Sequence, residues 1–147
     1  MLVPGPDGEL PVRIRDGFFQ HVPTGKRVPP ANRTLNKHGL VSFRVRGDAY
    51  YDSKVADTRA GQRALLVREP DNKHDPNAVA VHALNKSGEP VKVGYVNKGL
   101  ARRLAKRLDA GDAVAAWFMR GDPPGRDDAG VAVVLTDEDE IRRLLGP

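Results

Sequence analysis

The densest group of chemically versatile side chains lies in residues 68–77, Arg-Glu-Pro-Asp-Asn-Lys-His-Asp-Pro-Asn. Asp71 and Asp75 can serve as bases or ligands, and His74 can stack, donate a hydrogen bond or bind a metal. Asn72 can both donate and accept hydrogen bonds. The simpler interpretation is a strand-to-strand loop built of turn-forming residues. The residue types alone leave a binding site and an ordinary loop both open.

A metal site on this loop is a second hypothesis, with Asp71, His74 and Asp75 as ligands. These three residues lack the helical spacing of a zinc protease motif and the carboxylate count of a calcium loop. The sequence contains no cysteine, which excludes disulfides, thiol nucleophiles and thiolate-bound metals within this chain. No serine stands in a nucleophile motif, and no glycine-rich phosphate loop is present. We therefore expect no cofactor and no enzymatic activity, with a metal-dependent nuclease as an alternative.

A second cluster, of aromatic and basic residues, stands where the predicted strand at 41–45 ends. Arg44 and Arg46 are followed closely by Tyr50 and Tyr51. Such a pair can stack an unpaired base while the arginines neutralise its phosphate. The tyrosines can equally well pack on the rim of a barrel.

A third cluster lies on one side of a predicted helix. Its basic residues are Lys98, Arg102, Arg103, Lys106 and Arg107. A basic helix face is often only solvated, but the three clusters together favour single-stranded nucleic acid as the partner. An adaptor whose basic face binds an acidic protein is the alternative.

The charge distribution supports an anionic partner. The net charge is +5, and residues 1–46 and 47–108 each carry +5 while residues 109–147 carry −5. The longest apolar run, residues 113–119, is far shorter than the ~18 residues of a membrane span. The first residues show no secretory signal, so we expect a cytoplasmic protein with no membrane partner.

Proline and glycine are frequent in the first part of the chain and divide it from the rest. Residues 1–38 read as an irregular Pro/Gly-rich arm, with short extended pieces at 12–15 and 17–22. Alternating or continuous apolar runs then predict strands at 41–45, 64–67, 78–84, 91–96, 114–119 and 131–135. Helical spacing predicts helices at 97–111 and 137–145. Residues 39–147 are thus expected to form a β-rich α+β domain, a curled sheet or partly closed barrel with two helices.

The stretch from Val41 to Gly111 resembles the HIRAN domain. Four landmarks occur in the family's order: Gly-Asp-Ala-Tyr-Tyr at 47–51, Leu-Leu-Val-Arg-Glu-Pro at 65–70, the run 71–81, and Val-Gly-Tyr-Val at 93–96 before the Ala- and Leu-rich helix. The resemblance implies a small OB-like or SH3-like curled β-barrel. It also implies a binding module that, in fork-remodelling ATPases of DNA repair, holds the 3′ end of single-stranded DNA.

The resemblance assigns roles to individual residues. Tyr50 resembles the first stacking aromatic, and His74 falls where the family has a second aromatic, a tyrosine. Asp75 falls on the aspartate that binds the 3′-hydroxyl, Asn72 on a neighbouring asparagine, and Lys98 on a lysine that contacts phosphate. The predicted nucleic-acid-binding set is Tyr50, Tyr51, Asn72, His74, Asp75, Lys98, Arg46 and Arg102, for single-stranded DNA or RNA.

Three features depart from the family pattern. His74 is smaller than tyrosine and can carry a charge, which makes its stacking weaker or pH-dependent. Ala49 stands where the fork-remodelling proteins have an arginine, so one phosphate contact is lost. The sequence holds no helicase motor, so fork reversal is not implied.

Overall fold

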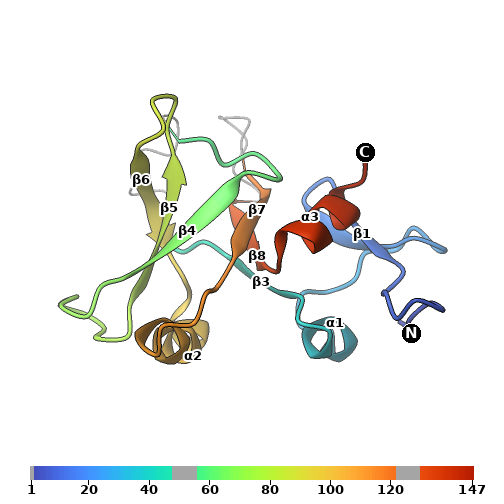
Figure 1. Ribbon diagram of the computed structural model, residues 1–147, viewed down its shortest axis with the longest axis horizontal. Helices are drawn as coiled ribbons and strands as arrows, with labels where there is room; N and C mark the ends of the chain where they lie inside the picture. The colour runs from blue at the N-terminus through green and yellow to red at the C-terminus, as the bar shows by residue number, and fades with distance from the viewer. Residues whose placement is uncertain (1, 48–55, 122–129) are drawn as a thin grey trace.

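The computed structural model describes residues 2–47, 56–121 and 130–147 and is dominated by one antiparallel sheet (Figure 1). The sheet has six strands in the order β3-β8-β7-β4-β5-β6. Their bounds are Val41–Arg44 (β3), Arg63–Arg68 (β4), Val79–Leu84 (β5), Pro90–Tyr95 (β6), Ala116–Arg120 (β7) and Ala132–Leu135 (β8). Each strand overlaps one of the six runs that the sequence predicts.

The two outer strands of this sheet approach each other, which curls it toward a barrel. Arg46, just beyond β3, forms an antiparallel bridge with Tyr95 of β6. The two residues exchange backbone N–H···O hydrogen bonds of 2.8 Å each. The close approach requires glycine at position 94, because a Cβ there would lie 2.5 Å from the carbonyl oxygen of Arg46. The predicted class, a β-rich curled barrel with helices, is confirmed.

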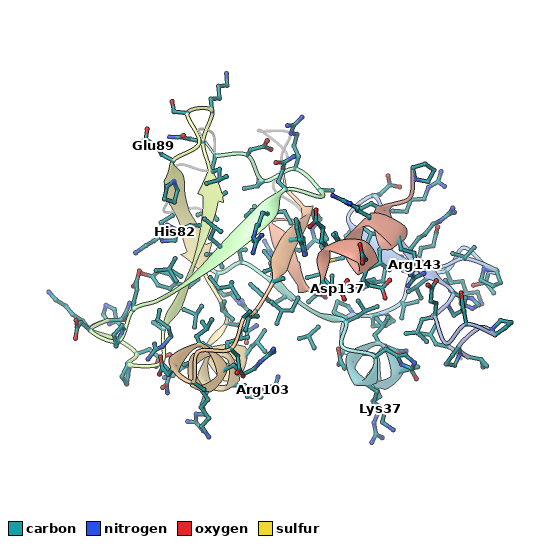
Figure 2. The ribbon with its side chains drawn as sticks, in the orientation of Figure 1. Lys37, His82, Glu89, Arg103, Asp137 and Arg143 are labelled. Carbon is teal, nitrogen blue, oxygen red and sulfur yellow. The ribbon has the colours of Figure 1, made fainter. Side chains whose placement is uncertain are left out.

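The two predicted helices are both present. Helix α2 (Lys98–Asp109) begins at Asn97, whose side chain accepts a hydrogen bond from the backbone N–H of Leu100. Its apolar side packs into the barrel core through Leu100, Ala101, Leu104 and Ala105. Helix α3 (Glu138–Leu145) begins at Asp137, and three acidic residues in its first turn suit the positive end of the helix (Figure 2). No helix among residues 2–47, 56–121 and 130–147 is long and apolar enough to cross a membrane.

The segment that we expected to be an irregular arm contains regular structure. Strands β1 (Val12–Arg15) and β2 (Phe18–His21) form a hairpin at the two predicted extended pieces. A third helix, α1 (Arg33–Lys37), follows, and Asn32 caps it by accepting from the N–H groups of residues 34 and 35. The sequence pattern missed α1 because five residues show no helical period. The domain boundary at residues 38/39 remains a proposal.

A second apolar core joins this segment to the outer face of the sheet. Phe118 and Val133 face the barrel core, whereas their neighbours Trp117 and Val134 face the second core. The second core also holds Leu10, Val12, Ile14, Phe19, Leu35, Ile141 and Leu144. Strands β7 and β8 are therefore buried on both faces, which explains their continuous apolar sequences.

Candidate functional site

The β4–β5 loop, residues 69–78, is organised by its own polar side chains. The Asn72 Oδ1 accepts hydrogen bonds from the backbone N–H groups of His74 (2.9 Å) and Asp75 (3.1 Å). The Asp75 Oδ1 accepts one from the N–H of Asn77 at 2.8 Å. Both are turns of the kind that Asn and Asp favour. The turn contact and the predicted binding role use the same carboxylate, which has further lone pairs to offer a ligand.

Glu69 holds this loop on the sheet. Its Oε1 accepts hydrogen bonds from the side-chain amide of Asn72 (3.1 Å) and from the hydroxyl of Tyr95 (2.7 Å). Its Oε2 lies 2.6 Å from the Lys92 ammonium. Burial opposes ionisation of Glu69, but these hydrogen bonds outweigh it and lower its pKa to about 2. Glu69 thus positions the site, although no local signal in the sequence marks it.

We expect the Glu69→Gln variant to lose on the order of 1–3 kcal/mol of unfolding free energy at pH 7. A carboxyl whose pKa is depressed in the fold contributes stability above its unfolded pKa, and loses it as pH falls toward about 2. The difference between wild type and variant should therefore shrink between pH ~4.5 and 2. Urea denaturation at several pH values measures it. Glu89→Gln, at the exposed tip of the β5–β6 hairpin, is the matched control (Figure 2), and an equal, pH-independent loss in both variants would contradict the assignment.

Two adjoining pockets lie where the β4–β5 loop meets the start of α2. The first, of about 300 Å³, is lined by Asn72, His74, Asp75, Ala78, Tyr95, Val96 and Lys98. The second, of about 380 Å³, is lined by Asp75, Asn77, Lys98, Gly99 and Arg102. Asp75 and Lys98 line both pockets. The structure thus brings together five residues of the predicted set: Asn72, His74, Asp75, Lys98 and Arg102.

In the second pocket the two cations, Lys98 and Arg102, outnumber the single carboxylate, Asp75. Lys98 is the first residue of α2, at the end of the helix where its dipole is already positive, and Arg102 follows one turn later. No acidic residue lies in the first turn to compensate. Lysine at this end is unfavourable for the helix by itself, so the arrangement makes sense if it serves a negatively charged ligand.

An ion pair holds the start of the β4–β5 loop against the far end of α2. The Arg68 guanidinium donates to both carboxylate oxygens of Asp109, at 2.9 and 3.2 Å. It also donates to the carbonyl of Ala78 at 2.9 Å. The hydrogen bond from Arg68 lowers the pKa of Asp109. Arg68 therefore connects the start of the loop to the last residue of the helix that lines the pockets.

The remaining predicted residues lie beside the pockets or outside the described residues. Arg46 is exposed, and its backbone pairs with Tyr95, which lines the first pocket. Tyr50 and Tyr51 lie outside the described residues, so their stacking role stays a prediction. The metal hypothesis finds no geometric support: within residues 2–47, 56–121 and 130–147, no three His, Asp or Glu side chains are grouped so that they could hold a metal ion.

Comparison with known proteins identifies the family. The model of the HIRAN domain matches residues 38–136. The chain belongs to the HIRAN domain family. All the site residues lie within the matched part of this HIRAN chain, and membership supports a nucleic-acid-binding module.

Solved structures similar to this HIRAN chain include two of low identity. The crystal structure of the HIRAN domain of human HLTF is 25% identical, with a TM-score of 0.48, over 74% of this chain and 93% of that one. A protein from Lactobacillus plantarum is 24% identical, with a TM-score of 0.48, over 65% of this chain and 89% of that one. No curated protein matches the chain.

Proposed function

We propose that this protein binds the 3′ end of single-stranded DNA, with RNA as a chemically related ligand, in the two pockets beside α2. The observation that supports this most is that Asp75 and Lys98 line both pockets. A carboxylate accepts a hydrogen bond from a terminal hydroxyl but repels a phosphate, whereas the lysine attracts the phosphate. The 3′ end of a strand carries a free hydroxyl and, one position before it, a phosphate, so it can contact Asp75 and Lys98 at the same time.

The other residues complete the proposed contacts. Lys98 and Arg102 contact the phosphates that precede the terminal nucleotide, aided by the positive end of α2. His74, which is exposed at the first pocket, presents an aromatic face to a base. Tyr50 supplies a second stacking face in this proposal. Binding and release of the strand need no chemical step, so the function proposed is recognition.

The deciding experiment measures the affinity for labelled oligonucleotides that end in a 3′-hydroxyl or a 3′-phosphate, with and without magnesium. The proposal expects tighter binding of the hydroxyl end and no cleavage. Magnesium-dependent products would contradict it in favour of a nuclease. Failure to bind either end would contradict it in favour of a protein adaptor.

The proposed phosphate contacts predict a salt-dependent affinity. Each contact with a single strand contributes ~0.7 to the slope of log K against log salt. Lys98→Ala should lower that slope by about this amount and weaken all base sequences alike. Lys86→Ala is the control, since Lys86 is exposed in the turn between β5 and β6, away from both pockets. A wild-type affinity that does not change from 50 to 500 mM salt would remove the electrostatic argument.

A further inference from the structure

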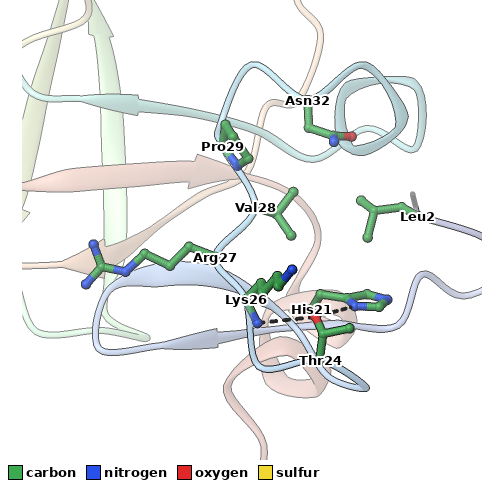
Figure 3. Close-up of a pocket in the computed structure, with 8 residues that line it drawn as sticks. All are labelled: Leu2, His21, Thr24, Lys26, Arg27, Val28, Pro29 and Asn32. Carbon is green, nitrogen blue, oxygen red and sulfur yellow. Dashed lines mark hydrogen bonds between the residues drawn. The ribbon is translucent and has the colours of Figure 1, made fainter.

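A second cationic cluster lies where the β1–β2 hairpin meets the barrel, built on the ring of Phe18. The guanidinium carbon of Arg27 lies 3.7 Å from the centroid of that ring, and that of Arg120 lies 4.5 Å from it. Guanidinium groups stack favourably on aromatic faces, which holds both cations in place. Figure 3 shows Arg27 extending away from the other residues that line the neighbouring pocket of about 280 Å³.

Two glycines make room for the arginines of this cluster. A Cβ on Gly17 would lie 2.7 Å from the Arg120 side chain, and one on Gly130 would lie 2.5 Å from the Nε of Arg44. Arg120 also donates to the carbonyls of Gly130 (3.2 Å) and Gly17 (3.3 Å). The side chain of Arg120 is therefore fixed between the hairpin and β8, and Arg44 lies against the same glycine.

The cluster concentrates three positive charges, those of Arg27, Arg44 and Arg120. Burial lowers the pKa of Arg120, and the charges of Arg44 and Arg27 lower it further. None of the three arginines forms an ion pair with an Asp or Glu in the part of the chain that the structure describes. A guanidinium has five N–H donors, and the two carbonyls use only part of those on Arg120. An external anion would both neutralise the cluster and accept the remaining hydrogen bonds.

We propose that Phe18, Arg27, Arg44 and Arg120 form a second phosphate-binding site, which contacts the sugar–phosphate backbone of a nucleic-acid strand away from its 3′ end. Arginine suits this ligand because its planar donors pair with phosphate oxygens two at a time. The cluster accounts for part of the +5 charge of residues 1–46, none of which lines the two end-binding pockets. Helix α2 packs in the barrel core and β1 in the second core, on opposite faces of β7 and β8, so the two sites are separate.

The inference rests on the proposed nucleic-acid-binding function and adds a length requirement to it. A trinucleotide with a 3′-hydroxyl fills only the end pockets, whereas a 20-nucleotide strand reaches both sites. The test compares these two thymidine oligonucleotides on the wild type and on the double variant Arg27→Gln, Arg44→Gln. Both arginines are exposed, so the fold should tolerate the change. The control, Lys37→Gln (Figure 2) with Lys86→Gln, removes the same charge at exposed positions outside the cluster.

The double variant should bind the 20-nucleotide strand about 25-fold more weakly than the control at 0.1 M salt. Two phosphate contacts contribute ~1.4 to the slope of log K against log salt, and the affinity that they add is taken to vanish at about 1 M salt. Its affinity for the trinucleotide should equal that of the wild type. Equal affinities of the double variant and the control for the long strand would overturn the second site while leaving the end pockets standing. A lower melting temperature with unchanged affinity would also overturn it, by assigning the cluster to stability. Absence of any binding by the wild type would instead overturn the proposed function itself.

Discussion

Replacing Gly94 with alanine should lower the free energy of unfolding by about 3–5 kcal/mol. The new Cβ would lie 2.5 Å from the carbonyl oxygen of Arg46 and 2.5 Å from a methyl group of Val45. The first of these atoms belongs to the backbone that closes the barrel, so it cannot move without breaking the bridge to Tyr95. The backbone φ of +152° at Gly94 is a further strain for any L side chain. Urea denaturation followed by circular dichroism measures the loss.

Gly88→Ala in the same hairpin is the matched control for backbone strain alone. Gly88 has a φ of +79°, but a Cβ there would meet nothing within 4 Å. That variant should lose only about 1 kcal/mol. If Gly88→Ala and Gly94→Ala lose similar free energies of unfolding, the close approach of β6 to Arg46 does not explain the effect at position 94.

The same closure positions the candidate site. Tyr95, which follows Gly94, lines the first pocket and donates its hydroxyl hydrogen bond to Glu69. Glu69 in turn holds Asn72 and the loop. Disturbing the barrel closure should therefore weaken nucleic-acid binding as well as stability, provided that binding is measured on folded protein.

The strands could be predicted from the sequence because each half-buried strand carries its own periodicity. Phe43 and Val45 are buried while Arg44 and Arg46 are exposed, as the alternation of residues 41–46 indicates. The second core could not be predicted, because it gathers residues that lie far apart in the chain, such as Phe19 and Trp117. No local pattern shows which apolar faces will meet.

Several residues that line the two pockets could be singled out from the sequence, but the hydrogen bonds that hold the loop in place could not. The polar run 71–77 and the basic start of α2 are both visible in the sequence, and the structure brings them together. The network around Glu69 was missed because it depends on a register shift in the pairing of β5 with β6. Val81 of β5 pairs with Gly94 of β6, while His82 pairs with Lys92, so β6 has one extra residue at this point. That extra residue lets Lys92 and Tyr95, three positions apart, both reach Glu69.

The Asp75→Asn variant should bind 3′-hydroxyl ends about 10- to 100-fold more weakly than the wild type, because a hydrogen bond to a charged acceptor is stronger than one to an amide. Asparagine can keep the turn, since its Oδ1 can accept the 2.8 Å hydrogen bond from the N–H of Asn77. The substitution thus removes the charge while retaining the loop. Affinity for 3′-phosphate ends should change far less, or improve, because the carboxylate that repels the terminal phosphate is gone.

Asp75→Ala separates the binding role from the turn. This variant loses the hydrogen bond to Asn77, so it should also lower the melting temperature, whereas Asp75→Asn should not. Measuring both variants on both ends, with the melting temperature as a parallel readout, gives four affinities to compare with the wild type. If Asp75→Asn is silent, or weakens hydroxyl and phosphate ends equally, Asp75 only shapes its own turn. A loss confined to the hydroxyl end in the asparagine variant is the result that end recognition requires, because only a free hydroxyl can donate to the carboxylate.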